Sequence, residues 1–453
     1  MSLRNLYEMS RRSFTVFSAQ MNTAGQNIAN VNTPGYARRR LALEPADPMT
    51  SGLLMRRTAN GAVGGVSIES FERMHDSLLS AASWEAKAGL GGADEETRLL
   101  GALEGVFGVG SGASLTDVMD GFWNAWSDVA NNPTDTASRN ALLHQAGTVA
   151  STLNGLDANI NRLAEQTQSA LAGSVDEANA LLTEIAGLND TVRAARAAGS
   201  PDLAAEDRRD AAVAELAAFA PVKVSDEPDG FHITVSGMSV LQGDEPTLFQ
   251  YEGPPDTATP AVRFGNTDVT LPASADGTLG AQVRTLTETI PDTIAALDGF
   301  AQSLVEGVNG QHAGGFGLDG STGLSFFDAG RLEAGSIRLS GDVLDNPGAI
   351  AAAGAADAPG DSDTANAIAG LREGFDTDAA AILSDVGAKL RSARTQAGAQ
   401  AAVADHLAAM EQAVSGVSMD EEMTKLLEAQ HAFAASARVL NTAEEMMQTI
   451  LAL

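Results

Sequence analysis

Hydrophobic residues at both ends of the chain recur in steps of four and three residues. The N-terminal series, called here the N-terminal seam, has as its large apolar members Leu3, Tyr7, Phe14, Phe17, Met21, Ile28 and Val31. The C-terminal seam consists of Met419, Met423, Leu426, Phe433, Ala437, Leu440, Met447 and Leu451. This spacing places each set of side chains on one stripe of an α-helix.

A helix that stands alone leaves such a stripe in water, at a cost of about 25 cal/mol for each Å² of apolar surface. We therefore expect helices over residues 3–32 and 419–451 to pair as a coiled coil. The alternative is that each helix docks separately on the core of the protein.

The N-terminal helix is expected to stop abruptly. A residue that precedes proline is disfavoured in the helical region, and asparagine and glycine tolerate turn geometry. The residues after the seam combine these features with a basic cluster: Asn30, Asn32, Thr33, Pro34, Gly35, Tyr36, Arg38, Arg39 and Arg40.

Between the two ends, helical periodicity gives way to strand alternation and then returns. Phe231, Ile233 and Val235 alternate with polar neighbours, which is typical of a strand. Further short strands are expected within residues 321–378, for example at residues 336–340. A helical stretch at 279–310 interrupts this region, and Pro291 should kink or split it.

These patterns predict a mainly α protein with an inserted β-containing domain. The N- and C-terminal helices pair as a coiled coil, a domain of long helices lies next, and the central β domain lies outermost. The predicted segments are 1–40 (N-terminal coiled-coil segment), 41–91 (connecting segment), 92–220 (first half of the helical domain), 221–378 (central β-containing domain), 379–411 (return of the helical domain) and 412–453 (C-terminal coiled-coil helix).

The formal net charge is −31, but the two ends differ in sign. Residues 1–57 contain eight arginines and three acidic residues, a net charge of +5, whereas residues 411–453 contain seven acidic and two basic residues, a net charge of −5. Two solvated polar faces would explain this, as would an electrostatic match between the ends. So acidic a chain is not expected to bind nucleic acid, which requires clustered cations, or an anionic membrane surface.

The sequence offers little for catalysis. It has no cysteine, which excludes disulfides, thiolate metal sites and cysteine nucleophiles.

No N-terminal apolar run of about 7–15 residues indicates a Sec signal, and no stretch approaches the roughly 20 apolar residues of a membrane span.

Three motifs invite an enzymatic interpretation. Residues 108–113 fit the pattern G-x-G-x-x-G/A, but a helical pattern precedes them where a dinucleotide site requires a strand. Residues 314–319 fit the start of a calcium-binding nonapeptide, which requires stacked copies. None of the six histidines has a metal-binding spacing. We therefore assign no catalytic, cofactor-binding or metal-binding residue, and we expect no enzymatic activity.

Residues 29–40, ANVNTPGYARRR, resemble the N-terminal motif of bacterial flagellar axial proteins, the family that includes rod, hook and hook-associated proteins. Residues 417–453 resemble the C-terminal helix that this family shares. Interior blocks at 108–154, 276–320 and 335–354 are similar to the family of first hook-associated proteins, FlgK.

The resemblance implies a structural subunit of the flagellum that forms the hook–filament junction and assembles with itself into a ring or tube through its terminal helices. The implied neighbours are hook protein and the next hook-associated protein, and the implied cytosolic partner is an export chaperone on the C-terminal helix. The resemblance also implies secretion by the flagellar type III apparatus without a cleaved Sec signal. The alternatives are another axial protein of hook or rod type and, further away, a secreted enzyme anchored by axial-protein termini.

Overall fold

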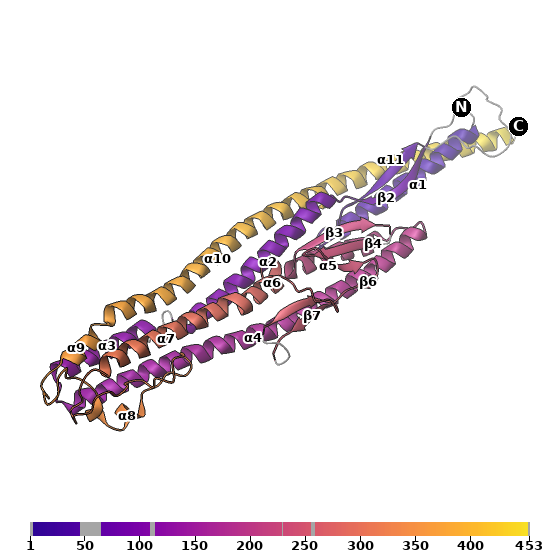
Figure 1. The fold of residues 1–453 in the computed structure, drawn as a ribbon. Coiled ribbons are helices and arrows are strands. Elements are labelled where there is room, and N and C mark those ends of the chain that lie inside the picture. The colour runs from indigo at the N-terminus through magenta and orange to yellow at the C-terminus, as the bar shows by residue number, and fades with distance from the viewer. Residues whose placement is uncertain (1–2, 46–64, 109–113, 229, 255–258, 452–453) are drawn as a thin grey trace.

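The computed structural model describes residues 3–45, 65–108, 114–228, 230–254 and 259–451. Long helices form an elongated bundle, and the N- and C-termini lie together at one end (Figure 1). The helices are α1 (Leu3–Ala29), α2 (Ser77–Val106), α3 (Leu115–Asn131), α4 (Thr136–Ala197), α5 (Leu203–Phe219), α6 (Gly277–Arg284), α7 (Ile290–His312), α8 (Gly341–Leu344), α9 (Asp363–Ala369), α10 (Arg372–Ser415) and α11 (Met419–Leu451). The predicted mainly α fold with inserted β structure is confirmed.

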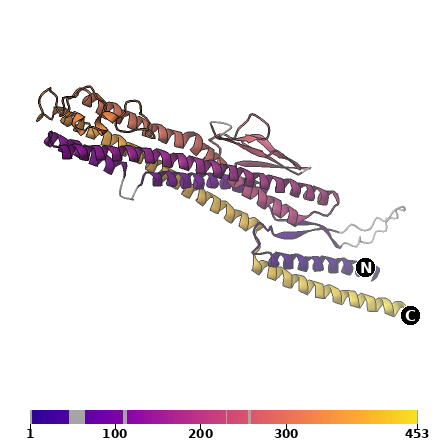
Figure 2. The same cartoon turned by 90° about the horizontal axis from the view of Figure 1, so that it is seen from below.

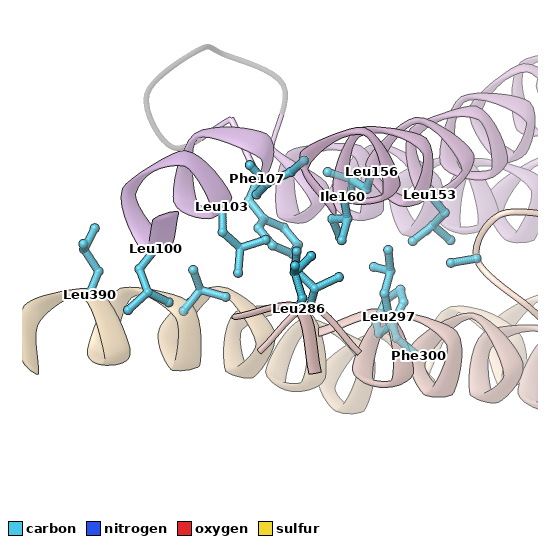
Figure 3. Packing of buried hydrophobic residues seen from close by; sticks show 14 of the residues in the cluster. Leu100, Leu103, Phe107, Leu153, Leu156, Ile160, Leu286, Leu297, Phe300 and Leu390 are labelled. Atoms are coloured by element: carbon cyan, nitrogen blue, oxygen red, sulfur yellow. The ribbon is translucent and has the colours of Figure 1, made fainter. Parts of the chain in front are cut away.

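The helix α4 is the longest element and spans the bundle. It has 62 residues, which corresponds to about 93 Å at 1.5 Å per residue. Apolar residues on one face of α4 are buried along its whole length, from Leu142 to Val192. Side chains of α2, α4, α7 and α10 meet in the interior, as Leu103, Ile160 and Leu297 illustrate (Figure 3). We call residues 77–415, from α2 to α10, the rod.

Polar side chains define where the rod helices begin. Asp76, Asp135 and Asp202 each accept hydrogen bonds from two backbone N–H groups in the first turn of α2, α4 and α5. Ser114 forms a reciprocal capping box with Asp117 at the start of α3. Such caps satisfy N–H groups that have no partner within the helix, so these helix starts are encoded locally.

The predicted interruption near Pro291 is confirmed. A π-helical turn, Thr285–Thr289, separates α6 from α7, and Pro291 lies in the first turn of α7. The N–H of Ile290 donates to the carbonyl of Thr285, five residues earlier. Because proline has no N–H, the wider turn lets the chain continue in nearly the same direction.

The strands form three small antiparallel sheets. They are β1 (Arg39–Pro45) with β2 (Val66–Arg73); β3 (Val222–Glu227), β4 (Gly230–Val235), β5 (Met238–Gln242) and β6 (Glu245–Pro246); and β7 (Phe249–Glu252) with β8 (Ala261–Phe264). Phe231, Ile233 and Val235 are buried, as the alternation predicts. The β3–β6 sheet lies beside α4 and α5 (Figure 1).

The order of parts along the bundle differs from the expectation. The sheets lie beside the helices, and the end farthest from the termini is built by α3, α8 and α9 (Figure 1). Residues 336–340 are not a strand, and Leu339 forms only an isolated bridge with Phe327. The backbone of Arg338 and Ser340 bonds that of Asp328 and Phe326, but the pairing stops there, because the carbonyl of Ile337 accepts from the side chain of Asn154 and Ser340 caps α8.

The main buried cluster runs from Trp84 to Ala393 and is rich in aromatic rings at the end farthest from the termini. Phe122 is fully buried there, with ring centroids 4.8 Å from Trp123, 6.1 Å from Phe327 and 6.3 Å from Phe326. No described residue of α1, the β1–β2 hairpin or α11 belongs to this cluster. The rod is therefore the part of the described chain with an extensive apolar core.

We expect Phe122→Ala to lower the free energy of unfolding by about 3–5 kcal/mol, because it removes buried surface and leaves a cavity. Guanidinium denaturation followed by circular dichroism measures this loss. The control is Val403→Ala on α10, where the side chain is 49% exposed and the expected change is below about 0.5 kcal/mol. Equal losses in the two variants would contradict the assignment of the core.

Candidate functional site at the joint of the chain ends

The first and the last helix of the chain lie side by side and extend past the end of the rod (Figure 2). The rings of Phe14 on α1 and Phe433 on α11 have centroids 4.1 Å apart. Small residues are also buried on the two helices, namely Ala24 on α1 and Ala429 and Ala443 on α11. The β1–β2 hairpin also contacts α1. We call α1, the hairpin and α11 together the terminal module.

The structure places the members of the two seams as follows. Half-buried members of the N-terminal seam are Tyr7, Phe14, Phe17, Met21, Ile28 and Val31, and those of the C-terminal seam are Leu426, Phe433, Ala437, Leu440 and Met447. Met419 and Met423 are 50% and 44% exposed. The side chains of Leu3 and Leu451 lie outside the described residues.

The buried stripe of α11 is therefore shifted from the C-terminal seam. Its buried members are Glu422, Ala429 and Ala443, seven and fourteen residues apart, with Leu426, Phe433, Leu440 and Met447 between and beyond them. From hydrophobicity alone, Met423 rather than Glu422 would be expected in the buried stripe. Packing instead favours alanine, which allows close approach of the helices, and a glutamate whose charge has partners.

Asn27 lies at the centre of the contact between the two chain ends, which we call the joint. Both polar atoms of its side chain form hydrogen bonds. Its Nδ2 donates to the carbonyl of Arg39 and to Oε2 of Glu422, both at 2.9 Å. Its Oδ1 accepts from the hydroxyl of Tyr36 at 2.8 Å and from the backbone N–H of Arg39 at 3.0 Å. The side chain is fully buried. One amide thus connects α1, the turn after it, β1 and α11.

The carboxylate of Glu422 is 2% exposed and meets three donors. Besides Asn27, Nε of Arg38 lies at 2.9 Å and Nζ of Lys425 at 3.1 Å. Burial alone raises the pKa of Glu422, but the hydrogen bonds from Asn27 and Lys425 and the charges of Lys425 and Arg38 outweigh it and hold the pKa below its ordinary value. Glu422 is therefore a buried anion whose ionised form is stabilised from three directions.

The turn after α1, residues 30–36, brings the chain into contact with α5 of the rod. The carbonyl of Asn30 accepts from the N–H of Thr33 at 2.9 Å, and the side chains of Asn32, Thr33 and Pro34 are exposed. Gly35 has φ of +75°, and a Cβ there would lie 3.2 Å from the Cβ of Ala211 on α5. Both the backbone conformation and the close approach favour glycine at this position.

The basic cluster is paired within the chain. Arg38 binds Glu421 at 2.8 Å as well as Glu422, and its N–H donates to the carbonyl of Ser415 at the end of α10. The guanidinium of Arg39 lies 5.1 Å from the ring centroid of Tyr36. Its partner on α5 is Asp207 at 3.5 Å, whereas Arg40 pairs with Glu72 on β2 at 2.9 Å.

A second charged cluster joins the hairpin to α5. Arg73, at the end of β2, is 8% exposed and faces three carboxylates, those of Glu206 at 3.5 Å, Asp207 at 3.1 Å and Asp210 in closest contact. Burial raises the pKa of Asp207 to about 6, and the charges of Arg73 and Arg39 only partly offset this. The ionised form of Asp207 is thus less well compensated than that of Glu422.

A cavity of about 690 Å³ opens beside the turn, between α2, α5 and the end of α10. Its walls mix cations such as Arg73 and Lys87 with anions such as Asp210 and Glu411. The hydroxyls of Ser80 and Ser83 donate to the carboxylate of Glu411 there, at 2.9 and 3.0 Å, and the mixed wall presents no single charge to a ligand.

The motifs that invite an enzymatic interpretation take structural places. The segment 108–113 follows the helix α2, and residues 109–113 lie outside the described part of the chain. In the segment 314–319, the carboxylate of Asp319 accepts hydrogen bonds from Ser321 and Asn346. His312 is buried, with Nδ1 2.8 Å from the carbonyl of Leu324 and Nε2 accepting from the N–H of Ala351.

Two further observations concern the described residues only. Among them, no group of three or more histidine, aspartate or glutamate side chains is arranged to hold a metal ion. Within the same ranges, no helix combines the length and hydrophobicity that crossing a bilayer requires.

The sequence pattern indicates Arg38, Tyr36 and Gly35 as site residues, but it does not indicate the buried polar residues around them. Asn27, Glu422, Arg73 and Asp207 are polar and lie in helical or strand patterns, where polar residues are normally solvated. The opposite charges of the two chain ends were the available signal. They indicated that an arginine of the N-terminal segment meets an acid of α11, without indicating which.

The fold and the joint define an elongated structural protein that combines a helical rod with a module made of both chain ends. Residues 100–327, half of the chain, match the family described as flagellar hook-associated protein FlgK helical domain, and residues 412–453 match the flagellar basal body rod FlgEFG protein C-terminal family. The chain belongs to the FlgK family of flagellar hook-associated proteins.

Relatives match nearly the whole chain. It is 24% identical to flagellar hook-associated protein 1 of Bacillus subtilis, over 98% of this chain and 97% of the relative, and 24% identical to the Escherichia coli protein of that name, over 96% of each. The solved structure of the flagellar hook junction protein FlgK from Burkholderia pseudomallei is 24% identical, with a TM-score of 0.49 over 56% of this chain and 46% of that one.

We expect Asn27→Asp to loosen the pairing of α1 with α11. The substitution keeps the shape of the side chain but removes both donors and places a second carboxylate against Glu422, and like charges in a buried site repel. Hydrogen exchange should accelerate by about tenfold or more in α1, equivalent to about 1.4 kcal/mol. Asn22→Asp, on the exposed face of the same helix, should change little. Equal protection in both variants would contradict the role of Asn27.

The raised pKa of Asp207 predicts the sign of a pH effect. Since the folded-state pKa is about 6 and the ordinary value 3.8, the folded chain binds this proton more tightly between about pH 4 and 6. Asp207 therefore makes the free energy of unfolding fall as pH rises through this window. In Asp207→Asn that contribution is absent, so the free energy of unfolding of the variant minus that of the wild type should increase from pH 4 to 7, on the order of 1–3 kcal/mol.

Denaturant titrations at several pH values measure this difference. Asp328→Asn is a control of opposite sign, because the hydrogen bond from Arg338 lowers the pKa of Asp328. A difference between Asp207→Asn and wild type that does not vary with pH would contradict the burial of an ionised Asp207.

Proposed function

We propose that this protein is a structural subunit of the hook–filament junction of the bacterial flagellum and that it assembles through its terminal module. The observation that carries the proposal is the joint, where both ends of the chain are fixed to one another by Asn27, Arg38 and Glu422. Membership of the hook-associated family supports the location in the flagellum. The division of the chain near residues 40 and 412 into terminal and interior segments is part of this proposal.

The exposed surface of α11 supports assembly by contacts between copies. Large apolar side chains remain more than a third exposed after α1 has packed against this helix: Met419, Met423, Leu427, Val439, Met446 and Ile450. Contacts between unlike surfaces of successive copies generate rings or helical tubes. Arg38, Arg39 and Arg40 are paired within the chain, so we assign them to holding the terminal module together. The exposed apolar residues of α11 are then the candidates for contact with neighbouring subunits.

The proposed neighbours in the flagellum are hook protein on one side and the next hook-associated protein on the other. In the cytosol, an export chaperone is proposed to cover the apolar residues of α11 before assembly. The proposed route is secretion by the flagellar type III apparatus without a cleaved Sec signal, and no nucleic acid or membrane is proposed as a partner.

Two other functions make different predictions. A hook or rod protein would share the terminal module, as the match of residues 412–453 to rod proteins illustrates. An extracellular enzyme would require a catalytic group in the rod or the sheets. Electron microscopy of a deletion strain distinguishes these functions, because loss of a hook protein removes the hook itself.

We expect cells that lack this protein to keep their hooks and to lose attached filaments, and expression of the wild-type chain to restore them. Phe14→Glu should fail to restore filaments, because it places a charge against Phe433, whose ring centroid is 4.1 Å away. Thr15→Glu, one position along on an exposed face, should restore them. Counts of filaments and hooks by electron microscopy measure both results.

Two outcomes would count against the proposal. Deletion cells without hooks would favour a hook or rod protein. Deletion cells with normal filaments but without some extracellular activity would favour the enzyme.

A further inference from the structure

We propose that the contact of Arg73 with the acidic face of α5 is a latch, which sets the direction of the terminal module relative to the rod and can open while both parts stay folded. This inference concerns the shape of one subunit and does not depend on where in the flagellum that subunit lies.

The boundary between the two parts has no extensive apolar core. Within the described residues, the main buried cluster begins at Trp84 and ends at Ala393, so it lies wholly in the rod. The terminal module has its own internal contacts, including Phe14 with Phe433 and Asn27 with Glu422. Two parts that are each held internally, and are joined by few apolar contacts, can move relative to one another as bodies.

Polar contacts with α5 and two passages of the chain join the parts. The hairpin runs into α2 after Arg73, and α10 runs into α11 after Ser415. The N–H of Arg38 donates to the carbonyl of Ser415, which ties these passages together at one point. A single such point can act as a pivot, so contacts away from it must fix the direction of the module.

Those contacts converge on three carboxylates of α5, all within residues 206–210. Arg73 binds Glu206, Asp207 and Asp210, Arg39 binds Asp207, and the backbone N–H of Ala37 also donates to Asp207. The side chains of Arg73 and Asp207 are 8% and 9% exposed. An ion pair that is so well buried depends strongly on each partner, because removal of one leaves the other uncompensated.

The hydrogen bonding of the cluster is incomplete. Nε of Arg73, Oδ1 of Asp207 and Oδ1 of Asp210 are buried and lie outside hydrogen-bond geometry, although Nε of Arg73 is 3.1 Å from Oδ1 of Asp207. The terminal nitrogens of Arg73 donate to Glu206 and Asp210, so Asp207 faces the charge of this guanidinium without receiving a hydrogen bond from it. The charged groups that surround these carboxylates on other elements are Arg39, His75 and Arg196, and Arg209 lies beside Asp210 on α5 itself.

The latch is tested by distances in the full-length chain between pairs of spin labels. The protein has no cysteine, so labels can be attached at His431→Cys on α11 and Glu184→Cys on α4, both exposed positions. A second pair, Glu184→Cys with Gln396→Cys on α10, reports on the rod alone. We expect a single narrow distribution for both pairs in the otherwise unaltered chain.

With Arg73→Met, the distribution between α11 and α4 should become at least about twofold wider, while the pair within the rod and the circular dichroism stay unchanged. Arg73→Lys should give an intermediate width. The matched control is Arg372→Met, which removes an arginine that also binds two carboxylates, Asp120 and Asp376, but lies at the far end of the rod.

Three results would overturn the latch. The first is an unchanged distribution in Arg73→Met. The second is a distribution that is already broad before Arg73 is replaced. The third is broadening of the pair within the rod, because Arg73 would then maintain the fold of the rod rather than the direction of the module.

Discussion

The buried carboxylate of Glu422 imposes one arrangement on the two ends of the chain. A carboxylate without partners is very costly to bury, and its donors here come from α1, from the turn after α1 and from α11 itself. Sliding α11 along α1 by one turn would keep many apolar contacts, since alanines recur along the stripe, but would separate Glu422 from Asn27 and Arg38. Apolar packing therefore supplies attraction between the helices, and the charge selects the register.

Asparagine recurs where a helix must hold an extended segment. Asn179 and Asn189 on α4 bind both the N–H and the carbonyl of Phe249 and Phe231, respectively. Asn309 on α7 binds the backbone of Phe326 and Phe327 in the same way, and Asn27 binds that of Arg39. A side-chain amide has the donor and acceptor of a peptide group, so it can take the place of a neighbouring strand at the edge of small sheets.

The sequence predicts those parts of the structure that local interactions determine and does not reveal contacts between residues that are distant in the chain. Helices of the rod are encoded locally by apolar periodicity and by caps such as Asp135, and alternation at Phe231, Ile233 and Val235 indicates β4 correctly. The strand expected at residues 336–340 is limited to one bridge with Phe327, because the carbonyl of Ile337 accepts from Asn154, a side chain 183 residues away that no local pattern reveals. The pairing of Arg73 with α5 likewise joins residues 133 and 137 positions apart. Leu426, Phe433, Leu440 and Met447 of the C-terminal seam lie in the contact with α1, whereas Glu422 is buried in place of Met423, because burial there depends on the partners of the glutamate.

The distribution of charge affects how copies of the chain approach one another in the proposed assembly. The chain has 59 acidic residues against 28 lysines and arginines, and several of its arginines are used inside the joint. Most of the acidic charge is thus left on the surface, where it repels other copies. Repulsion of this kind is screened within about 8 Å at physiological salt, whereas apolar contact acts only when surfaces touch. In the proposed assembly, the exposed apolar residues of α11 therefore contribute only once copies are in contact. The fixed pairing of α1 with α11 then matters because it holds those residues in the same arrangement within the terminal module of every copy.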